Sequence, residues 1–247
     1  MSRIRKTLWH TSVYMFGIVA DRGVALIFMA VYTRVFGEAS GQFAVWDVST
    51  ATVQFLAPVF ELGLASALVR FYHQYPGKAE RESAVHTVVT FVFLSVLIFT
   101  LITFLFVRPL AAFVFDSDNA VGLMRLVILI ASATVLGTMP LSLLRAKEKS
   151  MHFAALNLIR AFVGSIAILI LLFQWRSAEA ILLGDLIGLS AMALFGFIIC
   201  ARDLRPRIDR AVLKRMLSFS LPIVPFNIAV VILFMSDRYF LVDAIGL

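Results

Sequence analysis

The sequence predicts an all-α membrane protein with about seven transmembrane helices. Of its 247 residues, 61% are hydrophobic and only 15% are charged, whereas a soluble domain is about half apolar and about a quarter charged. The charges lie mainly between long apolar runs. Each run has at least the roughly 20 residues that a helix needs to cross the hydrocarbon core, and a helix satisfies its own backbone hydrogen bonds there. A soluble enzyme is therefore not expected.

The first apolar run predicts a transmembrane helix over residues 12–33. Basic residues precede it at Arg3, Arg5 and Lys6, as they would in a signal peptide. The run is longer than a signal core of about 7–15 residues, it contains Asp21 and Arg22, and no convincing small-residue cleavage site follows. We therefore interpret it as a retained span.

Windows of about 19 residues place the remaining spans. In chain order they are 43–69, 84–107, 121–144, 151–174, 178–200 and 217–242. The first six spans form three hairpins over residues 1–201. Residues 202–216, the longest and most basic connection, separate them from the seventh span in residues 217–247. We predict a lobe boundary at this basic loop.

The basic residues predict the orientation of the spans. Fifteen of the 22 lysines and arginines lie on one side of the predicted membrane, and only Arg34, Arg108 and Arg176 lie on the other. Because lysine and arginine are retained on the cytoplasmic side during insertion, we expect a cytoplasmic N-terminus. This topology and anionic lipid headgroups account for the net charge of +7, so no nucleic-acid partner is needed.

Several short stretches resemble the polysaccharide and O-antigen flippases of the multidrug/oligosaccharidyl-lipid/polysaccharide exporter superfamily. They are FGEASGQF (36–43), ELGLASALVRF (61–71), LLRA (143–146), FSLP (219–222) and SDRYFL (236–241). The resemblance covers nearly the whole chain. It implies one six-helix lobe plus the first helix of a second lobe. Since such transporters have 12 or 14 helices, we expect this chain to be truncated at its C-terminus.

Polar residues within the second predicted span recur every seven positions. Asp47, Gln54 and Glu61 therefore share one stripe of the helix, which extends over about 21 Å. We predict that this stripe faces the bundle interior or a cavity. Pro58 lies in the same span and is expected to bend it, because proline removes a backbone hydrogen bond.

Two other spans also carry ionisable groups at membrane depth. Asp21 and Arg22 lie about 15 Å from the cytoplasmic end of the first span, and Arg160 reaches a similar depth in the fifth, one turn after Asn157. Two guanidinium groups facing one cavity would suit a pyrophosphate. The alternative is that acidic residues such as Asp185 neutralise these arginines in interhelical pairs.

These considerations predict a substrate cavity and a set of coupling or ion-pairing residues. The predicted cavity residues are Arg22, Arg160, Asp21, Asn157 and Gln54, and the coupling or ion-pairing residues are Asp47, Glu61 and Asp185. The four histidines are isolated and Cys200 is the only cysteine. We therefore expect no catalytic residues, no metal site and no cofactor.

The resemblance implies a flippase in a bacterial inner membrane that moves a lipid-linked oligosaccharide, a polyprenyl pyrophosphate sugar, by alternating access. Membrane lipids, a polysaccharide polymerase and glycosyltransferases are the expected partners. Three alternatives stay open at this point: a multidrug exporter of the same superfamily, a membrane enzyme of polysaccharide assembly, and a half-transporter that does not transport alone. The short outer connections argue against the enzyme, since catalytic groups usually need a sizeable exposed loop.

Overall fold

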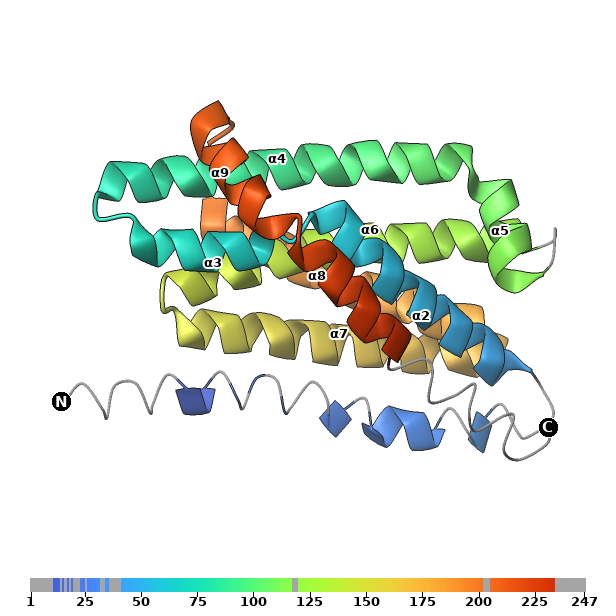
Figure 1. The fold of residues 1–247 in the computed structure, drawn as a ribbon. Coiled ribbons are helices and arrows are strands. Elements are labelled where there is room, and N and C mark those ends of the chain that lie inside the picture. Colours follow the sequence, from blue (N-terminus) through green and yellow to red (C-terminus); the bar gives the residue numbers. More distant parts are fainter. Residues whose placement is uncertain are drawn as a thin grey trace.

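The computed structural model is all-α over the residues that it describes, which are 41–116, 120–201 and 205–233 with 11–13, 15, 17, 19, 23, 24, 26–31, 34 and 35. Figure 1 shows long helices lying side by side. Their bounds are α2 Gln42–Glu61, α3 Leu64–Gln74, α4 Lys78–Leu105, α5 Val107–Phe115, α6 Val121–Ala146, α7 Ser150–Trp175, α8 Ala178–Cys200 and α9 Arg210–Ser220.

Six helical stretches in the described part are long and apolar enough to cross a membrane. They correspond one for one to the second through seventh predicted spans. The α8 helix occupies the predicted residues, and α6 and α7 differ from their predictions by two residues or fewer at each end. The first predicted span lies largely outside the described residues. The chain is therefore a multi-pass membrane protein.

The α6 helix lies at the centre of the bundle. Within its apolar stretch 61% of the residues are buried, against 22% for α4. By contrast, α4 exposes Phe93, Leu97 and Leu101, and α7 exposes Phe162. Large apolar side chains exposed along whole helices need lipid around them, because water would disfavour so much apolar surface.

Glycines allow α7 and α8 to approach closely. A Cβ atom built on Gly188 would lie 2.8 Å from the Gly164 Cα and 2.9 Å from the Arg160 carbonyl oxygen. Gly184 packs in the same way against the backbone of Ile168. Because dispersion contacts rather than the hydrophobic effect hold helices together in lipid, these two glycines stabilise the pair by letting the backbones approach closely.

The prediction of one continuous helix over 43–69 is wrong. The helix is interrupted at Leu62 and Gly63, whose φ angles are 55° and 67°, so that α2 ends and α3 begins. Pro58 stays inside α2, and its carbonyl still accepts the Leu62 N–H at 3.0 Å. The left-handed residues Leu62 and Gly63 therefore cause the interruption, and Pro58 does not.

The predicted loop 202–216 is in part helical, because α9 begins at Arg210. Asp209 caps this helix by accepting hydrogen bonds from the Ala211 and Val212 N–H groups. The preceding residues run along α4, where the Asp209 N–H donates to the Thr87 hydroxyl at 3.0 Å. Asp209 thus caps the start of α9. The hydropathy of this segment is low because of its basic side chains, so the window average did not predict a helix here.

Candidate functional site

The polar residues Asp47, Gln54 and Glu61 lie within the continuous helix α2 and therefore share one stripe, as their spacing predicted. The opposite side of α2 buries Ser49, Val53 and Phe60, and Ala51, one turn after Asp47, is also buried. Asp47 and Glu61 are half-buried, whereas Gln54 is exposed. That the stripe faces the bundle interior or a cavity stays a prediction.

Glu61 has a structural contact that its spacing did not predict. Its carboxylate Oε1 accepts the Ala65 N–H at 3.0 Å, across the interruption between α2 and α3. The first N–H groups of a helix have no partner within the helix, and a negative charge near them is favourable. Glu61 therefore caps α3, while its predicted role in ion coupling stays a prediction.

We expect Glu61→Ala to lower the free energy of unfolding by about 1 kcal/mol, the usual effect of losing an N-terminal cap. Glu61→Gln keeps an oxygen acceptor and should lose much less. Thermal unfolding of the detergent-solubilised variants measures the difference. Equal destabilisation by both substitutions would show that the negative charge, rather than the hydrogen bond, stabilises this site.

The predicted residues of α7 and α8 lie near the glycine contact between these helices. Arg160 is half-buried, and its carbonyl oxygen borders Gly188. Asp185, also half-buried, precedes Gly188 by three residues, or about 4.5 Å along α8. The structure thus brings Arg160 and Asp185 to one helix pair, near the same depth.

Asn157 is buried, with 7% of its surface exposed, and lies where Gly17 packs against α7. A Cβ on Gly17 would lie 3.1 Å from the Ala154 Cα and 3.9 Å from the Asn157 Cβ. The Asn157 amide donates to the Phe153 carbonyl of its own helix at 2.9 Å. Asp21 and Arg22, the other predicted cavity residues, lie outside the described residues.

A contact between two interrupted helices escaped the sequence analysis. The α9 helix ends at Ser220 and a turn at Leu221 and Pro222 precedes further helix. A Cβ on Gly63 would lie 2.8 Å from the Ser220 carbonyl oxygen. Pro222 was a local signal for the second interruption, but nothing in the sequence indicated that the two interruptions meet.

Arginines and aromatic rings join α3 to α9 at the basic end of the bundle. The Arg70 guanidinium lies 4.2 Å from the Phe219 ring centroid, and the Arg215 guanidinium lies 5.5 Å from that of Phe71. Phe71 and Phe219 meet edge to face at 5.8 Å. Such cation–π contacts contribute about 0.5–2 kcal/mol each. They attach the start of the seventh predicted span to the second.

The connections predicted to share one side of the membrane do converge in the structure. A cavity of about 470 Å³ is lined by Arg81 near the start of α4 and by Lys147 after α6. A second cavity, of about 460 Å³, is lined by Arg207 and Arg215 together with Glu80. The basic residues of three connections therefore gather at one end.

Within the ranges that the structure describes, no group of three or more His, Cys, Asp or Glu side chains is arranged to hold a metal ion. Cys200 is buried. The polar groups of the spans can form hydrogen bonds and charge pairs with a ligand or with one another.

The helices and polar groups together define a multi-pass membrane protein with ionisable side chains inside its spans. The family of polysaccharide biosynthesis proteins matches residues 6–247, and the chain belongs to this family. This match confirms the family resemblance that the sequence motifs indicated. No curated protein and no solved structure matches the chain.

Proposed function

We propose that this protein is a flippase that moves a lipid-linked oligosaccharide across a bacterial inner membrane by alternating access. Its membership of the polysaccharide biosynthesis family supports a role in making surface polysaccharide. The step that we assign to this protein is transport, because a sugar precursor assembled on a lipid inside the cell must reach the outer leaflet. We propose that the chain itself catalyses no covalent reaction.

The observation that carries the proposal is the set of half-buried ionisable groups within apolar helices. Arg160 and Asp185 lie well inside stretches that are long enough to cross the membrane, and Asp47 lies in such a stretch nearer its end. A charged side chain in hydrocarbon costs several kcal/mol unless it is paired or faces a wet cavity. Residues of this kind mark the paths of polar substrates, and a sugar pyrophosphate is such a substrate.

The arginines have a specific role in this proposal. We assign Arg22 and Arg160 to the pyrophosphate, because a guanidinium donates two parallel hydrogen bonds to phosphate oxygens. Asp21, Asn157 and Gln54 contact the sugar or orient the arginines. Asp47, Glu61 and Asp185 couple transport to an ion or pair with the arginines. The N-terminus is cytoplasmic, and the polymerase and glycosyltransferases of the same polysaccharide are the partners.

Deletion of the gene tests the proposed function. We expect loss of surface polysaccharide and accumulation of the lipid-linked oligosaccharide in the inner membrane, both reversed by the wild-type gene. Unchanged surface polysaccharide would contradict the proposal. Loss of cationic-dye export without any change in polysaccharide would instead identify a multidrug exporter.

Substitution of the arginines tests the mechanism. We expect Arg22→Ala to abolish surface polysaccharide and Arg160→Ala to lower it about tenfold or more, since one hydrogen bond to a charged group contributes about 1.5–3 kcal/mol. Membrane insertion should stay normal. The matched control is Arg125→Ala, because Arg125 is exposed near one end of α6 and can extend to the headgroups. Equal losses in all three variants would exclude a specific role for Arg22 and Arg160.

A further inference from the structure

A groove of about 500 Å³ lies between α4 and the C-terminal part of α8. Its lining comprises Val89, Thr90, Phe93 and Leu94 of α4, Phe197 of α8, and Arg205 and Pro206 of the connection that follows. All of these residues except Thr90 and Arg205 are apolar. The groove therefore offers an apolar surface beside one cationic residue.

The groove is accessible from the membrane near the basic end of the bundle. Phe93 and Leu94 are 54% and 41% exposed. Thr90 lies six residues after residue 84, where the predicted span begins, which is about 9 Å along the helix. Because half of the hydrocarbon core is about 15 Å thick, the groove lies within one leaflet. The charge distribution of the chain predicts that this is the cytoplasmic leaflet.

The connection beside the groove carries a strong positive charge. Residues 202–216 contain six basic side chains, Arg202, Arg205, Arg207, Arg210, Lys214 and Arg215, against the two acidic side chains of Asp203 and Asp209. Basic clusters of this size next to the cytoplasmic end of a span attract anionic lipids. Arg205 itself is exposed, and in the described part of the chain no carboxylate lies within 4 Å of it. Its charge is therefore available to a ligand.

Hydrogen bonds hold this connection against α4. The Arg207 N–H donates to the Thr90 hydroxyl at 3.3 Å, and the Asp209 N–H donates to the Thr87 hydroxyl at 3.0 Å. Pro206 has no N–H group, so it adds no unpaired donor to the apolar groove. These contacts fix the backbone of Arg205 beside the groove, and an arginine there can extend its guanidinium to the headgroups.

We propose that this groove binds an anionic phospholipid of the cytoplasmic leaflet. One acyl chain lies along Phe93 and Leu94, and the phosphate accepts hydrogen bonds from the Arg205 guanidinium. A zwitterionic phospholipid has the same phosphate, but the basic connection repels its ammonium group. The bound lipid joins α4, α8 and the connection that leads to α9. This inference goes beyond the proposed function and does not depend on it.

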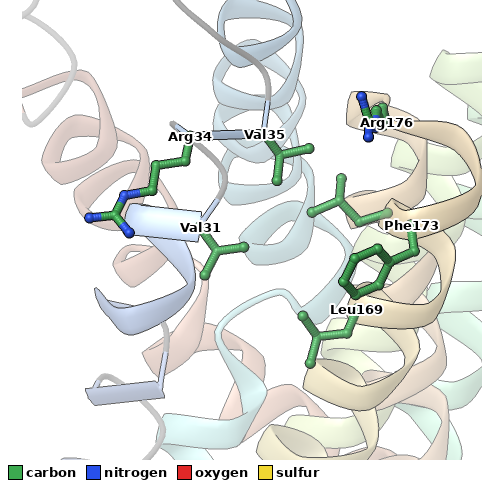
Figure 2. A pocket seen from close by; sticks show the side chains of 7 residues that line it. Val31, Arg34, Val35, Leu169, Phe173 and Arg176 are labelled. Atoms are coloured by element: carbon green, nitrogen blue, oxygen red, sulfur yellow. The ribbon is translucent and has the colours of Figure 1, made fainter.

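A pocket at the opposite end of the bundle lacks this combination. It has a volume of about 260 Å³, and its lining includes Val31, Arg34, Phe173 and Arg176. Figure 2 shows Arg34 and Arg176 on opposite sides of the apolar side chains, with Arg34 directed away from them. The connections of that predicted side carry only three arginines. Arg34→Ala therefore serves as a control that removes an arginine near an apolar pocket without changing the groove.

Native mass spectrometry of the protein released from nanodiscs of equal phosphatidylglycerol and phosphatidylcholine content tests the proposal. We expect the wild type to retain phosphatidylglycerol in preference to phosphatidylcholine by about tenfold or more, and Arg205→Ala to remove most of this preference. Arg34→Ala should keep it. Lys214→Ala should lower it clearly less than Arg205→Ala does, because Lys214 lies outside the groove.

A second pair of variants tests the position of the acyl chain. Leu94→Trp places a larger side chain in the groove, so we expect it to reduce the retained phosphatidylglycerol severalfold. Its matched control is Leu97→Trp, since Leu97 is exposed on the same helix but lies outside the groove. Both substitutions exchange one apolar side chain for another on the membrane side, so insertion should stay normal.

Three results would overturn the proposal. Equal retention of the two lipids by the wild type would show that the protein does not recognise the headgroup charge. Equal losses of preference in Arg205→Ala and Lys214→Ala would show that the whole connection attracts anionic lipid without a site at the groove. Equal retention of phosphatidylglycerol by Leu94→Trp and Leu97→Trp would show that no acyl chain lies in the groove.

Discussion

Replacing Gly188 with alanine is expected to destabilise the pair of helices α7 and α8 strongly. The added Cβ would lie 2.8 Å from the Gly164 Cα and 2.9 Å from the Arg160 carbonyl oxygen. Both neighbours are backbone atoms, so no side-chain rotation can make room. The helices must move apart, which we expect to lower the free energy of unfolding by about 1–3 kcal/mol, the usual effect of overpacking.

The same helix contact provides a control for this substitution. A Cβ on Gly164 would lie 3.5 Å from the Gly188 Cα, an ordinary van der Waals distance. In the part of the chain that the structure describes, no atom lies within 4 Å of a Cβ built on Gly122 in α6. Gly164→Ala and Gly122→Ala should therefore shift the thermal unfolding midpoint in detergent only slightly. A large shift for Gly122→Ala would show that helix propensity, rather than packing, decides these effects.

The separation of these helices should also affect transport. Arg160 and Asp185 lie beside the Gly188 contact, so movement of the helices changes the distance between these two groups. We expect Gly188→Ala to lower surface polysaccharide even in the fraction of protein that stays folded. If the folded fraction keeps full transport, the spacing of α7 and α8 at Gly188 does not affect the proposed cavity.

Replacing Gly63 with alanine has the second large expected effect. Gly63 has a φ of 67°, and a Cβ there would lie 2.8 Å from the Ser220 carbonyl oxygen. Alanine would add the conformational strain of a left-handed residue, about 1 kcal/mol, to a clash with the backbone of α9. We expect α9 to move away from α3 and the unfolding midpoint to fall markedly.

Gly41 offers a matched control, because its φ is 63° but no atom of the described residues lies within 4 Å of a Cβ built on it. Gly41→Ala carries the strain without the clash, so the difference between the two variants measures the contact with Ser220. Equal effects of Gly41→Ala and Gly63→Ala on the unfolding midpoint would exclude a contribution from packing. The cation–π contacts of Arg70 and Arg215 should weaken only in Gly63→Ala, since they depend on the position of α9.

Hydropathy predicted the long helices well and their interruptions poorly. The bounds of α8 follow from a continuous apolar run between Ser177 and Ala201. A window averages over about 19 residues, so it cannot detect two left-handed residues such as Leu62 and Gly63. Similarly, the charges of Arg210 and Arg215 lower the local hydropathy, which concealed the beginning of α9.

The sequence indicated which polar residues share a helix face, but not what surrounds them. Spacing placed Asp47, Gln54 and Glu61 on one stripe of a helix, because helical geometry alone determines which residues share a face. The direction of that stripe depends on the helices that pack on the other faces. For the same reason the sequence did not indicate that Glu61 caps α3.

The sequence by itself determined the surrounding medium, the six apolar spans of the described residues and the gathering of basic residues at one end of the bundle. These are local properties, because the length and charge of one segment decide how it partitions into a bilayer. Only the tertiary structure decided which distant residues meet, such as Gly63 with Ser220 and Gly188 with Gly164. Such contacts depend on the close packing of whole helices, which a linear pattern of residues does not specify.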